Sequence, residues 1–352
     1  FGPEPEFFVF DDVKWGSNIS GSFFKIDSEE GAWASGADYP DGNMGHRPGV
    51  KGGYFPVPPV DSLHDLRAAM CTAMEQMGLD IEVHHHEVAT AGQCEIGVKF
   101  NTLVKKADEV QILKYCVHNI AHAYGKTATF MPKPIQGLTG NGCHAHISVW
   151  DAPGAASKVN IFAMNANDSS QTAELGLSEK GHHFLGGIMK HASALAAITN
   201  PTVNSYKRIN APRTISGATW APNTVTWTGN NRTHMVRVPG PGRFELRLPD
   251  GAVNPYLLQA VIIAAGLSGV NSKADPGKRH DIDMYAEGHK VRGAPKLPLN
   301  MLDALREYDK DKDLKTAMGE EFSAAYLKMK HSEWNDFCNH FSSWEKANTM
   351  DI

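Results

Sequence analysis

The fold is decided by the stretch EPEFFVF at residues 4–10, which joins two chemically different halves. The second half, FFVF, is an aromatic and β-branched run, which is typical of a buried strand. The first half places Glu4 and Glu6 two residues apart, and in a strand residues i and i+2 point to the same face. The stretch therefore predicts a core strand that begins by presenting two carboxylates on one side.

Five further stretches have a similar composition near period two, and we expect them to be strands: LDIEVHHHEV (79–88), TATFMPKP (127–134), CHAHISVW (143–150), THMVRVP (233–239) and RFELRLP (243–249). The spacing of apolar residues predicts amphipathic helices at 61–79, 106–125, 178–201 and 254–270, and charged helices from 297 onward. The segment from Phe7 to Pro59 is rich in Gly, Asp, Ser and Pro, which indicates long loops between short strands. No phosphate-type glycine loop follows a strand, so a doubly wound nucleotide fold has no support.

The other predicted strands repeat the grouping of ionisable residues on one face. The rows are His85 and Glu87 with Glu95 a short turn further on, then His144, His146 and Ser148, and then Arg243, Glu245 and Arg247. Each row taken alone has an ordinary alternative: a solvated strand face, core histidines with satisfied hydrogen bonds, or a cross-strand ion-pair ladder. Their joint occurrence instead predicts one cavity lined by carboxylates, imidazoles and guanidiniums.

Such a cavity suits divalent metal ions and phosphate. Carboxylate oxygens with an occasional imidazole favour Mg²⁺ or Mn²⁺, whereas zinc sites prefer Cys and His. Clustered glutamates repel one another unless cations neutralise them, and the planar fork of arginine matches the oxygens of a phosphoryl group. The residues therefore predict an ATP-consuming phosphoryl transfer to an anionic substrate.

The composition narrows the class of protein. The 352 residues, 41% hydrophobic and 21% charged, are typical of a folded globular protein. Acidic residues outnumber basic ones by 39 to 34, which disfavours a nucleic-acid or anionic-membrane partner. The longest apolar stretch, at 255–267, is shorter than the roughly 20 residues that span a bilayer. The five cysteines form no CxxC pair, which indicates a reducing, cytoplasmic location.

The residues singled out above lie in segments that resemble the glutamine synthetases, and the resemblance covers nearly the whole chain. The segments similar to the bacterial type I enzymes include FGPEPEFFVFDD (1–12), GHRPGVKGGYFPVPPVDS (45–62), HHHEVATAGQ (84–93) and NSYKR (204–208), and their ATP-region signature resembles KPIQGLTGNGCHAHIS (133–148). From INAPRTISG (209–217) to NPYL (254–257) the chain is more similar to a divergent branch, which includes type III rhizobial glutamine synthetases and γ-glutamylmethylamide synthetases. The resemblance implies an α+β catalytic domain over residues 1–352. We expect a curved, mostly antiparallel sheet that forms a funnel-shaped active site surrounded by helices, with residues 297–352 as a C-terminal helical tail.

The resemblance also implies a role for each row of ionisable residues. Two ions of Mg²⁺ or Mn²⁺ would be held, the first by Glu6, Glu87 and Glu95 and the second by Glu4, His144 and Glu245. The residues implied for glutamate binding are Gly140, His144, Arg208 and Arg247, and those implied for stabilising the transferring phosphate are Arg232 and Arg237. The residues implied for nucleotide contact are Glu82, His146, Ser148, Arg232 and Arg243.

The implied activity is ATP-dependent ligation of ammonia to the γ-carboxylate of L-glutamate through γ-glutamyl phosphate. The implied assembly is a homo-oligomer, a dodecamer of two stacked hexamers. The family's flap carries a glutamate that helps to deprotonate ammonium, but no Asp or Glu lies between Arg208 and Arg232. This departure favours, as an alternative, methylamine or another small amine as the nucleophile.

Two further departures concern neighbouring parts of the active site. The N-terminal β-grasp domain that completes the family's active site does not precede Phe1 in this sequence, which leaves a non-catalytic scaffold as another alternative. The stretch from Arg237 to Glu245 is shorter than in the type I pattern and lacks its lysine. Tyr285 lies near the position of the regulatory adenylylated tyrosine of type I enzymes, but its neighbours differ, and a surface tyrosine is an equal alternative.

Overall fold

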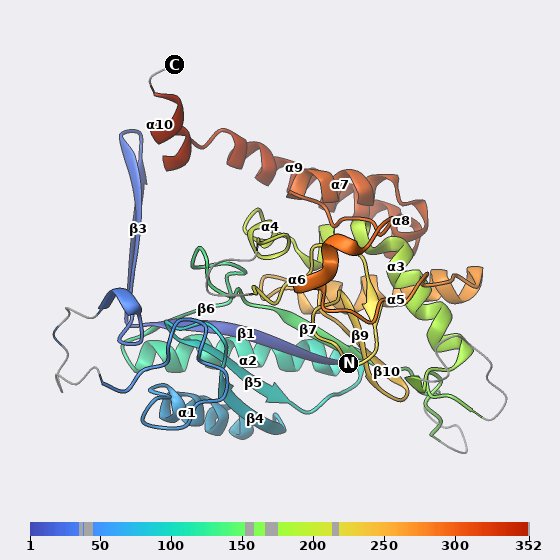
Figure 1. Cartoon of the computed structure of the whole chain (residues 1–352), viewed down its shortest axis with the longest axis horizontal. Helices are drawn as coiled ribbons and strands as arrows, with labels where there is room; N and C mark the ends of the chain where they lie inside the picture. The colour runs from blue at the N-terminus through green and yellow to red at the C-terminus, as the bar shows by residue number, and fades with distance from the viewer. Residues whose placement is uncertain (35–37, 39–44, 152–157, 166–174, 213–217, 351–352) are drawn as a thin grey trace.

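A computed structural model of the chain describes residues 1–34, 38, 45–151, 158–165, 175–212 and 218–350 (Figure 1). The strands are β1 (Gly2–Phe10), β2 (Asp12–Asn18), β3 (Gly21–Asp27), β4 (Ile81–His86), β5 (Gln93–Val98), β6 (Thr127–Thr129), β7 (Cys143–Ile147), β8 (Trp227–Thr228), β9 (Val236–Gly240) and β10 (Arg243–Leu246). The helices are α1 (His64–Gln76), α2 (Leu103–Ala123), α3 (Glu179–Thr199), α4 (Ser205–Arg208), α5 (Pro255–Ser272), α6 (Met284–Glu287), α7 (Met301–Lys310), α8 (Lys312–Met318), α9 (Glu320–Cys338) and α10 (Ser343–Thr349). Short 3₁₀ turns lie at Ala32–Ala34 and Gly288–Lys290.

β1 lies in the middle of the main sheet, whose strand order is β4-β5-β1-β7-β10-β9-β8. Each neighbouring pair along this path is antiparallel except β8 and β9, which are parallel. Residues 2–5 of β1 pair with β7, residues 6–8 pair with β5, and residues 8–10 pair with β6. The predicted α+β fold with a mostly antiparallel sheet is confirmed, and the first strand of the chain joins its two halves.

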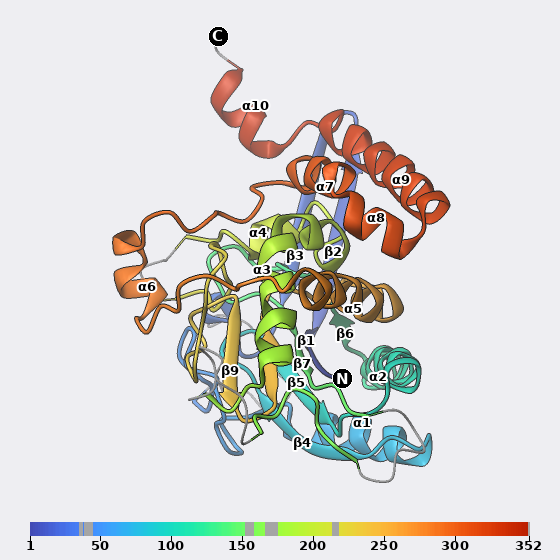
Figure 2. The same cartoon turned by 90° about the vertical axis from the view of Figure 1, so that its right-hand side faces the viewer.

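Two hydrophobic cores hold helices against this sheet (Figure 2). Phe7 and Val9 of β1 are almost fully buried, and they belong to a core with apolar residues of α1 and α2. A larger core joins β7, β9 and β10 to α3, α5 and α7. α3 and α5 approach closely at Gly187, where a Cβ atom would lie 2.1 Å from the carbonyl oxygen of Ala265.

α5 is the most apolar of the predicted helices. It is long and apolar enough to cross a membrane by length and composition alone. In the structure it packs against α3, α2 and α8, and eight of its residues are buried. This is the placement of a core helix.

The helices predicted from residue 297 onward are present as α7 to α10. Tyr308 of α7 is fully buried, and the Tyr326 hydroxyl of α9 donates to the Ala197 carbonyl of α3 at 2.7 Å. α7 and α9 therefore pack on the body of the protein, whereas α10 has no buried residue.

The sequence predicts long loops between short strands from Phe7 to Pro59, and two such strands at residues 12–27 form the β2–β3 hairpin (Figure 1). This hairpin projects from the body of the protein, and its apolar side chains Trp15, Phe23 and Phe24 are more than half exposed. A strand with no buried face lacks the apolar alternation that identifies a strand in a sequence, so the sequence did not show where these two strands lie.

Candidate active site

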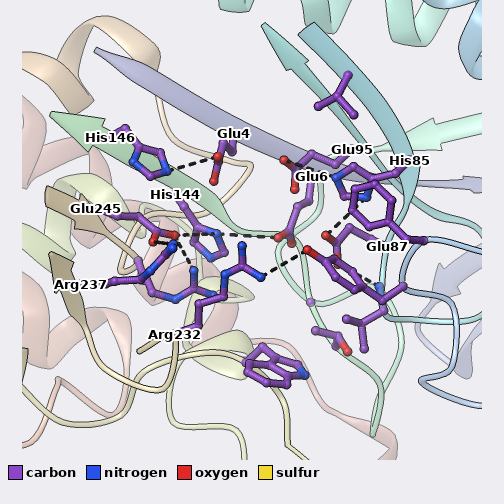
Figure 3. Close-up of a pocket in the computed structure, with 18 of the residues that line it drawn as sticks. Glu4, Glu6, His85, Glu87, Glu95, His144, His146, Arg232, Arg237 and Glu245 are labelled. Atoms are coloured by element: carbon purple, nitrogen blue, oxygen red, sulfur yellow. Dashed lines mark hydrogen bonds and ion pairs between the residues drawn. The ribbon is translucent and has the colours of Figure 1, made fainter. Parts of the chain in front are cut away.

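The main sheet carries a cavity of about 590 Å³ whose wall is made mostly of charged side chains (Figure 3). Its lining includes each of the following predicted residues: Glu4, Glu6, Glu87, Glu95, Gly140, His144, His146, Arg208, Arg232, Arg237, Arg243, Glu245 and Arg247. The prediction that the separate rows of ionisable residues share one cavity is therefore confirmed by their placement. The role of each residue stays a prediction.

Strand register explains why these residues meet. Glu4 lies opposite His144 on β7, and Glu6 lies opposite Glu95 on β5. Glu95 in turn lies opposite His85 on β4. Directly opposed residues of antiparallel strands have Cβ atoms about 5 Å apart, so the pairing of the strands makes these side chains neighbours.

One group of possible metal ligands consists of Glu4, His144 and Glu245, and we call it the Glu245 cluster. One ligand atom from each residue lies within 4.8 Å of the other two. Nδ1 of His144 is 3.7 Å from Oε1 of Glu245. This trio is the ligand set that the resemblance implied for the second ion.

A second group consists of His85, Glu87 and Glu95, and we call it the Glu87 cluster. It differs from the implied ligand set of the first ion in containing His85 in place of Glu6. Glu6 is engaged elsewhere, because its Oε2 accepts hydrogen bonds from the Gly142 backbone N–H at 2.6 Å and from Nε2 of Gln93 at 3.2 Å. Its Oε1 lies 3.9 Å from Nδ1 of His144, so Glu6 stands between the two clusters.

The electrostatics of the Glu87 cluster suit a cation. Burial, followed by the negative charge of Glu6, raises the pKa of Glu87 to about 8. Burial also raises the pKa of Glu95 well above its usual value, with Glu4 and Glu87 adding to the effect. Carboxyl groups that are costly to ionise together are stabilised when a divalent ion neutralises them.

In the Glu245 cluster, nearby arginines offset the effect of burial on the carboxylate. Burial acts to raise the pKa of Glu245, but Arg247, His146 and Arg237 outweigh it, so this pKa lies below its usual value. Burial and the nearby arginines hold the pKa of His144 well below its usual value, which leaves a neutral imidazole with a lone pair. An ionised carboxylate beside a neutral imidazole is a donor set that fits Mg²⁺ or Mn²⁺.

Five arginines from different parts of the chain line the cavity wall, and among them Arg208, Arg237 and Arg247 have hydrogen-bond partners that fix their positions. Arg237 donates from Nη1 to Glu245 at 2.6 Å, and Arg247 donates to the other oxygen of Glu245 at 2.5 Å. Arg208 is buried at the end of α4 and donates to the Leu248 carbonyl at 2.9 Å. Nε of Arg247 is buried and has no hydrogen-bond partner in the described part of the chain.

Two predicted nucleotide contacts, Glu82 and Ser148, do not line the cavity in the described part of the chain. Glu82 is exposed on β4, and the Ser148 hydroxyl accepts a hydrogen bond from the Trp150 indole at 3.0 Å. Tyr285 is half-buried rather than a surface residue, and its hydroxyl donates to the Ala221 carbonyl at 3.4 Å. Burial raises the pKa of Tyr285 to about 12.

Sequence reasoning assigned no role to several residues of the cavity wall, among them Lys51, Tyr54, Phe55 and Trp220. Phe55 stacks on the His85 ring with centroids 4.0 Å apart, and the Tyr54 hydroxyl accepts from Arg232 at 3.3 Å. These residues lie in loops, where periodicity gives no signal. Trp220 lies in the acid-free segment between Arg208 and Arg232, and that absence of acids was the only signal pointing to it.

Comparison with known proteins identifies the family. Residues 1–349 match the model of the glutamine synthetase catalytic domain. The chain is 65% identical to a glutamine synthetase of Rhizobium meliloti over 289 residues, which is 82% of this chain and 64% of the relative. It is 47% identical to the Escherichia coli K12 glutamine synthetase over 342 residues, which is 95% of this chain and 69% of the relative.

Solved structures agree with this assignment. A GmaS–ADP complex superposes with a TM-score of 0.80 at 42% identity, covering 100% of this chain and 72% of that one. A cryo-electron microscopy structure of Plasmodium falciparum glutamine synthetase gives a TM-score of 0.83 at 26% identity, covering 99% of this chain and 74% of that one. The chain thus spans a little under two thirds of the Rhizobium relative. By sequence and by fold, the chain belongs to the glutamine synthetase family.

Proposed function

We propose that this chain forms the catalytic domain of an ATP-dependent ligase that joins ammonia to the γ-carboxylate of L-glutamate. The observation that carries the proposal is the single cavity in which two carboxylate clusters face several arginines. A divalent ion at each cluster would offset the charge of the nucleotide phosphates. We infer Mg²⁺ or Mn²⁺, two per site, from the oxygen-rich donor sets.

In the proposed reaction, a γ-carboxylate oxygen of glutamate attacks the terminal phosphorus of ATP, and ADP leaves. The unpartnered Nε of Arg247 and the buried guanidinium of Arg208 support a role for these residues in holding the glutamate. Arg232 and Arg237 would stabilise the charge on the transferring phosphoryl group. Gly140, in the wall beside Arg208, would approach the substrate through its backbone.

In the second step, the amine nitrogen attacks the carbonyl carbon of γ-glutamyl phosphate, the bond to phosphate breaks, and a proton leaves the nitrogen. No carboxylate in residues 209–231 accepts that proton, because this segment contains none. Trp220 of the same segment lines the cavity instead. This observation favours the second candidate function, a ligase that uses methylamine or another small amine.

We also propose that the protein works as a homo-oligomer, specifically the dodecamer of two stacked hexamers that the family resemblance implies. A two-stranded hairpin is marginally stable alone, and β2–β3 exposes Trp15 (73%) and Phe23 (62%) to solvent. Contact with a second copy would bury these side chains. We further infer a cytoplasmic location, since all five cysteines are free.

The test is to measure ADP release with glutamate, Mg²⁺ and either ammonium or methylamine. We expect release to require all components, and Glu87→Gln and Glu245→Gln to abolish it. Arg232→Ala should lower kcat more than it raises the KM for glutamate. Glu321→Gln, on the exposed face of α9, is the matched control and should retain wild-type turnover.

The outcomes separate the candidates. A kcat/KM for methylamine well above that for ammonium would establish the second function in place of the first. Near wild-type turnover of Glu245→Gln would contradict the metal assignment. No glutamate-dependent ADP release from the assembled protein would indicate the non-catalytic scaffold.

A further inference from the structure

Behind the Glu87 cluster lies a buried pair, His86 and Glu30, that lines no part of the cavity in the described chain. The His86 side chain is fully buried and Glu30 is 2% exposed. Nε2 of His86 lies 2.9 Å and 3.1 Å from the two carboxylate oxygens of Glu30. Ser62 donates from its hydroxyl to Glu30 at 2.9 Å, which fixes the carboxylate from another side.

The other nitrogen of the His86 ring is within hydrogen-bond distance of two backbone segments. Nδ1 lies 2.8 Å from the Gly53 carbonyl oxygen and 2.6 Å from the Glu87 carbonyl oxygen. Carbonyl oxygens only accept, so Nδ1 carries a proton and donates to them. The ring therefore ties the backbone of Glu87 to the loop that contains Gly53.

Backbone hydrogen bonds continue this attachment. Gly53 donates to the Val88 carbonyl at 3.2 Å, and Phe55 donates to the His86 carbonyl at 3.2 Å. A Cβ atom on Gly53 would lie 2.5 Å from both the Glu87 carbonyl oxygen and Nδ1 of His86, so the approach requires glycine. The loop is thus packed directly onto the end of β4.

The backbone carbonyl of His86 also orients the neighbouring side chain of His85. Nδ1 of His85 donates to the His86 carbonyl at 3.1 Å, which turns Nε2 toward Glu95, 3.8 Å from its Oε1. Phe55 covers the other side of the His85 ring by stacking on it. A histidine whose one nitrogen donates to a carbonyl presents the other nitrogen as a ligand in a fixed direction.

From this arrangement we propose that His86 and Glu30 are positioning residues that set the geometry of the Glu87 cluster and leave the Glu245 cluster unaffected. His86 acts on His85 through its carbonyl and on Glu87 through its ring. Glu30 holds the ring in the orientation in which Nδ1 reaches the Gly53 and Glu87 carbonyl oxygens. This inference rests on the proposed function only in that it takes the Glu87 cluster to bind a divalent ion.

The experiment measures Mn²⁺ binding to the whole protein by calorimetry and electron paramagnetic resonance, with no turnover required. We expect two classes of Mn²⁺ site in the wild type. Glu30→Ala should weaken one class by about 10- to 100-fold, the usual cost of losing a partner behind a metal ligand, and leave the other within twofold. Glu30→Gln retains an oxygen that accepts from His86, so it should restore most of the affinity.

Two further variants make the result specific. Gly53→Ala disturbs the same contact from the loop side and should weaken the same class of site, and it decides the question if Glu30→Ala does not fold. Asp311→Asn removes the carboxylate that lies 2.5 Å from another buried histidine, His191, between α3 and α8. This control should lower Tm without changing either Mn²⁺ affinity.

The outcomes are distinct. If the wild type binds no Mn²⁺, the proposed function itself fails. If the wild type binds two ions but Glu30→Ala and Gly53→Ala weaken neither class, or weaken both equally, the positioning role is overturned. Loss confined to one class, and to the class that Glu87→Gln also removes, supports it.

Discussion

The buried carboxylates should make the metal-free protein lose stability as the pH rises from 6 to 8. Burial and the charge of Glu6 raise the pKa of Glu87 from its ordinary value of 4.5 to about 8. Between these values the folded protein keeps Glu87 protonated while the unfolded chain ionises it, so folding takes up a proton. The stabilising contribution is full below pH 4.5 and is lost as the pH rises through about 8.

The size of the effect follows from the pKa. At about 1.4 kcal/mol per pH unit, the interval between 4.5 and about 8 corresponds to about 5 kcal/mol of unfolding free energy for Glu87 alone. About half of this falls between pH 6 and pH 8. Glu6 and Glu95, whose pKa values burial also raises, act in the same direction. Saturating Mg²⁺ neutralises the carboxylates, so it should remove most of the fall.

The assay is thermal unfolding at pH 6, 7 and 8, in EDTA and in excess Mg²⁺. We expect Tm to fall by several degrees with pH in EDTA and to change little in Mg²⁺. His86 contributes in the same direction, because Glu30 raises its pKa against the effect of burial. Glu87→Gln isolates the carboxylate: its metal-free Tm should fall less steeply than that of the wild type. A wild-type Tm in EDTA that stays flat or rises, or an equally steep fall in Glu87→Gln, would refute the reasoning.

Two further predictions concern stability away from the cavity. Asp61→Asn should lower the free energy of unfolding in urea by about 3–5 kcal/mol. The substitution leaves the fully buried guanidinium of Arg67 without the carboxylate that lies 3.0 Å away. Replacing both residues, Asp61 by Leu and Arg67 by Met, should recover much of this free energy. Gly187→Ala should lower stability by about 1–3 kcal/mol in the same assay, because its Cβ would lie 2.1 Å from the Ala265 carbonyl. Gly240→Ala, whose Cβ meets nothing within 4 Å, should change it by less than about 0.5 kcal/mol. Equal losses in the two glycine variants would contradict the packing argument.

The sequence was sufficient to predict the site where the alternation of side chains along a strand decides which residues share a face. Glu4 and Glu6 were placed on one face because they lie two residues apart on a buried strand, and the structure puts both in the cavity wall. Parity does not reveal which strands pair. The register that sets Glu6 opposite Glu95, and Glu95 opposite His85, comes only from the assembled sheet.

The sequence was insufficient where loops supply the site. Phe55 stacks on His85, but its loop has no periodicity from which that contact could be predicted. His85 was recognised as part of a row, yet nothing in the row showed that His85, and not Glu6, would group with Glu87 and Glu95. The difference arises because Glu6 is held by the Gly142 backbone N–H, a contact between residues far apart in the chain.

The central place of β1 has a consequence for how the protein is made. β1 is synthesised well before the strands that complete the sheet, because its partner β7 follows only after residue 142, and β10, which pairs with β7, follows only after residue 242. Until both Arg208 and Arg247 have emerged, the nascent chain carries the Glu6 carboxylate without the two guanidiniums whose charges act to lower its pKa. Pairing of such distant strands is slow, and incomplete sheets expose unpaired edges. The cavity therefore forms late in synthesis, and chaperones that shield β1 until then would be expected to raise the yield of folded protein.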